Sequence, residues 1–254
     1  MRTGTQSIDR AAGLLVRVVE SARPPTAGEL ARAAGLPRST VSRLLAALER
    51  QGLVQRENRR GTVAVGPVLL RLASRGVSRD DLVELSGSAL NRLADASSET
   101  INLAVPTPDG VEHLAQVDSP HFLGSSNWVG RRVPHHCTAV GKVFLAFGAV
   151  EPQAGRLPAL TAATITDPGV LASQLDVVRA RGWATAGGEL EPGLTAIAAP
   201  VLGSDGRAVA ALSISGPDIR LTQRRLEDLA ATVVLEAAQL SARLGHRNAT
   251  EGAA

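Results

Sequence analysis

Apolar residues in the first third of the chain recur at helical spacing in successive segments. In the first segment they return every three or four residues from Ile8 to Val19, directly after Ser7, a residue suited to cap a helix. In the second, Thr26 and Glu29 form a capping box ahead of an apolar run. The spacing therefore predicts two helices before residue 35.

The third segment predicts a helix whose two faces differ in character. The turn Gly35–Pro37 precedes it, because Gly readily ends one helix and Pro suits the first turn of the next. One face is apolar at Val41, Leu44, Leu45 and Leu48. The opposite face presents Ser39, Ser42, Arg43 and Arg50. Two helices joined by a short Gly-containing turn are typical of the helix-turn-helix unit, whose second helix enters the major groove of DNA.

A short β-hairpin is predicted directly after the third helix. Leu53–Arg56 and Thr62–Gly66 alternate apolar and polar residues, and the turn Glu57–Gly61 joins them. A hairpin in this position is a wing. Its basic residues would reach phosphates or the minor groove beside the recognition helix. These residues are Arg56, Arg59 and Arg60.

The remainder of the chain alternates strand pairs with separate helices. The pattern predicts two hairpins, residues 101–105 with 111–117 and residues 195–202 with 208–215, each joined by a turn that contains Asp and Gly. Helices are expected over the ranges Pro67–Ala73, Asp80–Asp95, Cys137–Phe147, Pro168–Arg181 and Thr222–Leu244. Hairpins with helices apart from them favour a two-domain α+β fold whose second domain has a largely antiparallel sheet with flanking helices.

The net charge changes sign along the chain. The 254 residues contain 27 basic residues, all of them Arg except Lys142, and 24 acidic ones. Residues 1–76 hold 13 Arg against five acidic residues, whereas residues 77–254 hold 14 basic against 19 acidic residues. A basic first third before an acidic remainder predicts a nucleic-acid-binding domain joined to a domain of another function.

The composition excludes several classes of protein. Hydrophobic residues make up 44% and charged residues 20%, which is typical of a packed core rather than of disorder. Aromatic residues make up only 2%, which argues against stacking platforms for single-stranded nucleic acid. One cysteine, Cys137, excludes an intramolecular disulfide framework and a cysteine-based zinc finger. No apolar run approaches a membrane span and the first residues lack an apolar signal core, so we expect a cytoplasmic protein with no membrane partner.

An ordered set of motifs runs through the chain. In the first third these are QSIDRA at 6–11, GLPRSTV at 35–41, RLL at 43–45 and LERQGLV at 48–54. Later they are RVPHHCTAVGK at 132–142, AIAAPV at 196–201 and ALSISGP at 211–217. Together they resemble the IclR family of bacterial transcription regulators, over residues 6 to about 244. The chain departs from the family pattern at Ala186–Gly188, where acidic residues are usual, and at Ala196, where Cys is usual.

The resemblance implies a DNA-binding regulator, more often a repressor than an activator. It implies a winged helix-turn-helix domain over 1–66, a linker helix over 67–79 and a GAF-like effector-binding and oligomerisation domain over 80–246. The polar residues beyond it, 247–254, are expected to form a flexible tail. It further implies a homodimer or a dimer of dimers that binds a palindromic operator in double-stranded DNA. A small-molecule effector would modulate that binding, and no cofactor or metal is expected.

Two sets of candidate site residues follow. The DNA-binding candidates are Arg38, Ser39, Thr40, Ser42 and Arg43 on the third helix and Arg56, Arg59 and Arg60 on the wing. The effector-binding candidates are His136, Cys137, Thr138, Ala139, Gly141, Ala196, Ser213 and Ser215. Hydroxyls and the backbone amides at the start of the helix near Cys137 suit a carboxylate, and Arg131, Arg132 and Lys142 could add positive charge.

Other functions remain open at this point. The segment His135–Cys137 suggests an enzyme or a redox sensor, because a Cys near His at a helix start can be a nucleophile. Adjacent residues seldom point at one another, however, which also argues against a shared metal ion. A different alternative is a sequence-independent DNA-binding protein with a purely structural dimerisation domain. The large second domain favours the ligand-responsive regulator.

Overall fold

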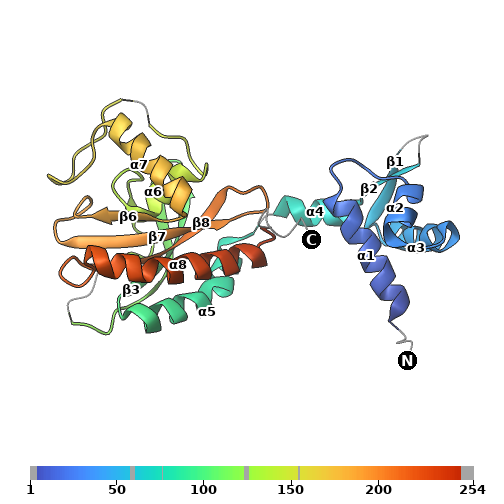
Figure 1. Cartoon of the computed structure of the whole chain (residues 1–254), viewed down its shortest axis with the longest axis horizontal. Coiled ribbons are helices and arrows are strands. Elements are labelled where there is room, and N and C mark those ends of the chain that lie inside the picture. Colours follow the sequence, from blue (N-terminus) through green and yellow to red (C-terminus); the bar gives the residue numbers. More distant parts are fainter. Residues whose placement is uncertain (1–4, 58–60, 76, 123–125, 154, 247–254) are drawn as a thin grey trace. The chain divides into compact units, whose positions relative to one another are not determined.

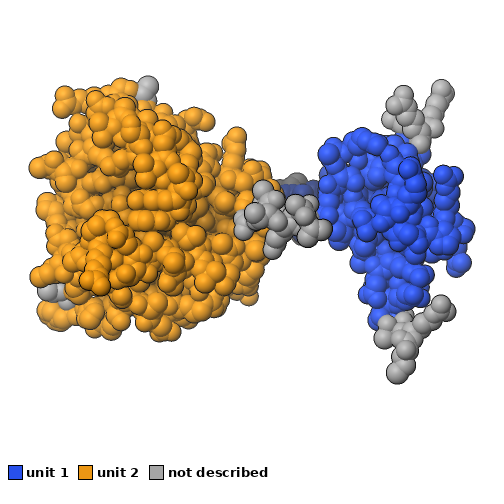
Figure 2. All heavy atoms as spheres, viewed as in Figure 1, with its two compact units in different colours: residues 1–78 blue, residues 79–254 orange. Residues whose placement is uncertain are grey.

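The computed structural model describes residues 5–57, 61–75, 77–122, 126–153 and 155–246. The chain divides into two compact units, residues 1–78 and residues 79–254, which Figure 2 draws in different colours. Each unit has a hydrophobic core of its own. The predicted tail, residues 247–254, lies outside the described residues.

The first unit is a three-helix bundle with a β-hairpin and a following helix. Its elements are α1 (Gln6–Glu20), α2 (Ala27–Ala34), α3 (Arg38–Arg50), β1 (Val54–Glu57), β2 (Thr62–Val65) and α4 (Pro67–Arg75). The predicted capping box is present, since Glu29 accepts the Thr26 amide and Thr26 accepts the Glu29 amide. The carboxylate of Glu29 also accepts from Arg23 and from the Thr26 hydroxyl. The Thr26 amide and these two donors lower the pKa of Glu29 to about 2. Gly35 then ends α2 in the left-handed conformation, as the sequence predicts.

The prediction for α1 is wrong in two details. Ser7 does not cap the helix: Thr5 precedes it, and neither side chain makes a capping bond. The buried stripe is Leu14 and Val18, whereas Ile8 is 68% exposed. Only the second half of α1 contacts the rest of its unit closely. The periodicity of the apolar residues therefore predicted a core-facing side that is one residue away from the observed one.

The second unit is an antiparallel sheet between two layers of helices. Its helices are α5 (Arg79–Ser97), α6 (Ala139–Ala146), α7 (Pro168–Arg181) and α8 (Gln223–Arg243). Its strands are β3 (Thr100–Thr107), β4 (Gly110–Val117), β5 (Arg132–Val133), β6 (Ala184–Gly187), β7 (Leu194–Leu202) and β8 (Ala208–Pro217). Every pair in the order β5-β4-β3-β8-β7-β6 is antiparallel, which confirms the predicted α+β fold. Helices α5 and α8 cover one face of the sheet, and α6 and α7 lie over the other (Figure 1).

The two faces of the sheet carry side chains of different size. The face toward α5 and α8 is built from large aliphatic residues such as Ile101, Leu103 and Leu212. The alternate positions, toward α6, are small, as at Ala104 and Ala211. Small residues allow α6 to pack close to the sheet and leave space beside its first turn.

Several predicted boundaries differ from the structure by one or two residues. The helix expected from Cys137 begins at Ala139, and the first hairpin extends to Thr107 and Gly110, so its turn is shorter than predicted. The short strands β5 and β6 were not predicted, because two to four residues at a sheet edge carry little periodic signal. Within the described residues, no helix is long and apolar enough to cross a bilayer.

Candidate DNA-binding surface and effector cavity

The polar face of α3 is open to solvent. Val41, Leu45 and Leu48 are buried against the rest of the first unit, as predicted. The candidates on the other side are accessible: Arg38, Ser39, Ser42 and Arg43 are exposed, and Thr40 is half-buried. The helix therefore presents hydroxyl and guanidinium groups outward on a packed scaffold.

The wing contributes one described arginine. Arg56 lies on β1 and pairs with Glu49 of α3, with 3.3 Å between Nε and Oε2. This exposed pair connects the wing to the end of the recognition helix. The other two wing candidates, Arg59 and Arg60, lie outside the described residues.

A cavity of about 50 Å³ lies in the second unit between the start of α6 and the small-residue face of the sheet. Six of the eight effector candidates line it: Cys137, Thr138, Ala139, Ala196, Ser213 and Ser215. Eight further lining residues were not among the effector candidates: Asn102, His113, Trp128, Val133, Val140, Ala186, Leu190 and Leu194. Among the described lining residues there is no Lys, Arg, Asp or Glu.

Helix α6 begins at the cavity wall with two unused donors. Thr138 caps the helix: its hydroxyl accepts the Gly141 amide, and its carbonyl accepts the Lys142 amide. The amides of Ala139 and Val140 have no protein acceptor among the described residues. Both residues line the cavity, so the positive end of the helix dipole and two free N–H groups lie at its wall.

The opposite wall is polar but uncharged. Ser213 and Ser215 lie on one face of β8 and are buried, not exposed to solvent. His113 stands beside Trp128, with 6.0 Å between the ring centroids, and burial lowers the pKa of His113 to about 4. At pH 7 its ring is therefore neutral. A polar residue in an otherwise apolar strand, such as Asn102 between Ile101 and Leu103, was the signal that could have revealed this wall.

Cys137 has the properties of a packed thiol. It is fully buried, and burial together with the nearby Glu189 raises its pKa to about 11. A reactive cysteine needs the opposite shift, toward thiolate at neutral pH. The environment therefore argues against the nucleophile and the redox sensor.

Two effector candidates lie away from the cavity lining. His136 is buried and its Nε2 lies 2.9 Å from the Pro158 carbonyl oxygen. Gly141 packs against the backbone of the preceding turn: a Cβ placed there would lie 2.2 Å from the His135 carbonyl oxygen. Gly141 is therefore a close-packing glycine, which explains its place in the motif without a ligand.

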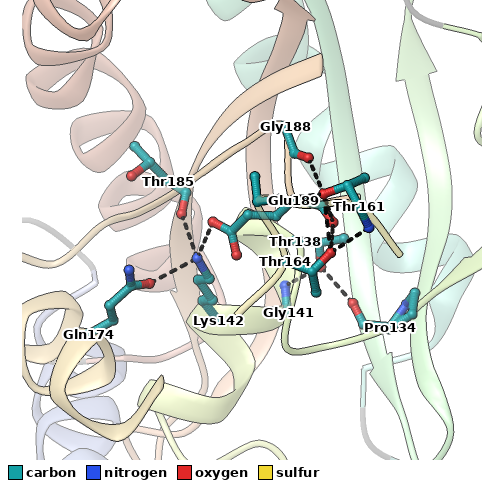
Figure 3. A network of polar contacts seen from close by, with 11 residues as sticks. Pro134, Thr138, Gly141, Lys142, Thr161, Thr164, Gln174, Thr185, Gly188 and Glu189 are labelled. Atoms are coloured by element: carbon teal, nitrogen blue, oxygen red, sulfur yellow. Dashed lines mark hydrogen bonds and ion pairs between the residues drawn. The ribbon is translucent and has the colours of Figure 1, made fainter. Parts of the chain in front are cut away.

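None of the three cations expected near the effector, Arg131, Arg132 and Lys142, lines the cavity. Lys142 is buried, and its Nζ binds Glu189 Oε1 at 2.5 Å, Gln174 Oε1 at 2.9 Å and the Thr185 carbonyl oxygen at 3.2 Å (Figure 3). Thr164 in turn donates to the Glu189 carbonyl oxygen. This network ties α6 to α7, β6 and the loop before α7. Arg131 and Arg132 are exposed, and Arg131 lies over the Trp128 ring at 5.6 Å.

The described residues hold no group of three or more His, Cys, Asp or Glu side chains that could bind a metal ion. Neither the 135–137 segment nor the cavity thus offers a metal centre.

Both units match models of one protein family. Residues 7–58 match the IclR helix-turn-helix domain, and residues 74–242 match the bacterial transcriptional regulator IclR C-terminal domain. The chain belongs to the IclR family of bacterial transcription regulators. It is therefore a transcription regulator and not an enzyme.

Individual IclR-family proteins are similar to this chain over nearly its whole length. The transcriptional repressor IclR of Escherichia coli K12 is 32% identical over 248 residues, which cover 94% of this chain and 90% of the relative. The structure is similar to that of the Agobacterium tumefaciens repressor BlcR, with a TM-score of 0.73, 27% identity and coverage of 96% and 99%. It is also similar to an IclR homolog from Microbacterium hydrocarbonoxydans complexed with 4-hydroxybenzoate, with a TM-score of 0.58, 27% identity and coverage of 94% and 99%.

Proposed function

We propose that this protein is a repressor whose affinity for a palindromic operator is modulated by a small organic acid bound in the second unit. The observation that carries the proposal is the cavity at the start of α6, with two free backbone amides at its wall. A purely structural dimerisation domain has no need of such a site. Two relatives are named as repressors, which supports this direction of regulation.

The exposed face of α3 is the proposed reader of DNA sequence. Ser39, Thr40, Ser42 and Arg43 would contact base edges or phosphates in the major groove. Arg38 and the wing residues Arg56, Arg59 and Arg60 would contact the backbone and fix the position of the unit. A regulator with these contacts acts where the DNA is, in the cytoplasm.

The proposed effector carries a carboxylate. Two N–H groups at a helix N-terminus bind an anion without a cationic side chain, and the Ala139 and Val140 amides supply them. The relative complexed with 4-hydroxybenzoate binds such an anion. The proposed contacts come from the cavity lining, and His136 and Gly141 are not among them.

A homodimer, or a dimer of dimers, is the proposed assembly. In the single chain, apolar side chains stand exposed on α1 and α4, including Ile8, Val16, Leu70 and Leu72. Burial of such residues against a second copy would stabilise a two-fold assembly. A two-fold protein matches two half-sites separated by about one helical turn of DNA or its multiples.

A DNA-protection experiment tests the proposal. The probe is the region upstream of the protein's own gene, with excess competitor DNA near physiological salt. We expect a discrete protected site with two-fold symmetry, whose protection changes when small carboxylates are added. Uniform protection that disappears as salt rises would instead indicate binding through phosphates alone and would contradict the proposal.

A further inference from the structure

The effector cavity holds two buried acceptors that face no donor. Asn102 on β3 and His113 on β4 are 1% and 7% exposed, and both line the cavity. Within the described residues, Asn102 Oδ1 and His113 Nδ1 have no hydrogen-bond partner. A buried acceptor without a donor costs free energy, so this wall is suited to a bound group that donates protons.

The orientation of the Asn102 amide follows from its neighbours. The Ser215 hydroxyl donates its proton to the Thr100 carbonyl oxygen, at 3.5 Å. Ser215 Oγ can therefore only accept from Asn102, whose Nδ2 lies 3.4 Å away. This assignment leaves Oδ1, the acceptor end of the amide, for the cavity.

The tautomer of His113 follows in the same way. Its ring is neutral at pH 7, so only one ring nitrogen carries a proton. The Arg131 backbone favours the protonated ring, which is the effect of an acceptor beside one ring nitrogen. Because Nδ1 has no partner, we assign the proton of the neutral ring to Nε2. Nδ1 consequently presents a lone pair to the cavity.

One wall of the cavity therefore has free hydrogen-bond donors, and the other has free acceptors. The α6 wall offers the N–H donors of Ala139 and Val140, whereas the β3–β4 wall offers the acceptors of Asn102 and His113. A ligand that satisfies both walls needs an acceptor group at one end and a donor at the other. The volume of about 50 Å³ favours a small ligand.

We propose that the effector is a small hydroxy acid, and that Asn102 and His113 select it over the corresponding keto acid. The carboxylate would accept from the Ala139 and Val140 amides, and the hydroxyl would donate its one proton to one of the two acceptors, Asn102 Oδ1 or His113 Nδ1. A keto oxygen has only lone pairs, so it would leave both acceptors without a donor. This inference rests on the proposed function and narrows the class of its effector.

Isothermal titration calorimetry on the full-length protein tests the selection with two matched pairs of probes. These are lactate against pyruvate and 3-hydroxybutyrate against acetoacetate. In at least one pair, the hydroxy acid should bind about tenfold more tightly or better, because a site built to bond a hydroxyl rejects the analogue that lacks the proton. Asn102→Leu removes the acceptor at similar volume and should weaken only the hydroxy acid, which brings the ratio toward one. His113→Leu is the second variant if thermal melting shows that Asn102→Leu does not fold.

The possible outcomes distinguish the proposed organic-acid effector from the proposed selection of a hydroxy acid. Equal or tighter binding of the keto acid in both pairs overturns the selection, while the organic-acid effector stands. A preference that survives both substitutions overturns the role of these two residues. If none of the four acids binds, both proposals are overturned: that the effector is a carboxylate and that it carries a hydroxyl group.

Discussion

Gly141 owes its place in the chain to backbone packing. Its Cα lies so close to the His135 carbonyl that no side chain fits. Gly141→Ala must therefore displace the turn before α6, and we expect a loss of about 2–4 kcal/mol in the free energy of unfolding. Urea unfolding followed by tryptophan fluorescence measures this, because Trp128 and Trp183 both lie in the second unit.

Gly87→Ala is the matched control for that substitution. Gly87 lies in α5 of the same unit, and a Cβ there meets nothing within 4 Å. Alanine should thus stabilise the helix, by about 0.5–1 kcal/mol. An equally mild effect of Gly141→Ala would show that the turn is not fixed against α6.

Because the pKa of His113 is lowered in the folded protein, the free energy of unfolding should depend on pH. Burial holds its pKa at about 4, below the ordinary value of 6.5, so the unfolded chain binds a proton between these pH values and the folded chain does not. The contribution to stability is therefore complete above pH 6.5 and falls, by about 3 kcal/mol, as the pH drops to 4.

The difference in unfolding free energy between wild type and His113→Leu isolates this effect, because all other groups titrate in both proteins. We expect the difference to shift against the wild type by about 3 kcal/mol between pH 7 and pH 4. A difference that is constant with pH would mean that the imidazole titrates normally in the folded protein.

Substitution of Arg43 tests the proposed DNA-binding surface. It is exposed on the polar face of α3, so Arg43→Ala should remove a base or phosphate contact without affecting the fold. The expected loss is about 1–3 kcal/mol of operator affinity, measured by fluorescence anisotropy with labelled operator. Arg207→Ala, in the turn between β7 and β8, removes the same charge from the other unit and should have little effect. Equal losses in the two variants would point to net charge rather than to a contact.

At the scale of the element, the first turn of α6 determines what the cavity can bind. Ala139→Pro deletes one of the two free amide protons in a position where Pro suits a helix, and Thr138 already has the extended backbone that precedes Pro. Helix α7, which starts with Pro168, shows the same arrangement in this chain. We expect a carboxylate to bind at least about tenfold more weakly, by calorimetry.

Ala139→Val is the matched control for this variant, because it adds similar volume and keeps the N–H group. It should retain most of the affinity that Ala139→Pro loses. Equal weakening by both substitutions would indicate that space, not the amide, is what the ligand needs.

Local patterns account for the parts of the fold that the sequence predicted correctly. The capping box of Thr26 and Glu29 and the helix Pro168–Arg181 are defined by residues within a few positions of each other, so periodicity and capping rules found them. The hairpins β3–β4 and β7–β8 followed from alternation and their turns.

The features that the sequence did not predict depend on contacts between segments that are far apart in the chain. Lys142 was expected near the ligand, but its partner Glu189 lies 47 residues further on and draws it into an ion pair. Asn102 and His113 lie on strands that were predicted, yet which face of these strands meets α6 is decided only by the packing of the second unit. Six effector candidates were nevertheless brought together, because the motifs that contain them lie at one end of α6 and on β7 and β8.

For the whole molecule, we propose that a ligand in the cavity changes the affinity for the operator. A ligand has this effect only if it binds two states of the protein with different affinity, and such coupling is typically 1–3 kcal/mol, or about 5–150-fold. The cavity and the α3 surface lie in different units, so this coupling is a property of the assembled protein and not of either site.

The most direct measurement is the dissociation constant for the operator, by fluorescence anisotropy, with and without a saturating organic acid. The wild type and Ala139→Val should show a change of about fivefold or more. Ala139→Pro, at the same acid concentration, should show almost none. If the acid binds the wild type by calorimetry but leaves its operator affinity unchanged, the cavity does not regulate DNA binding and the proposed function is wrong.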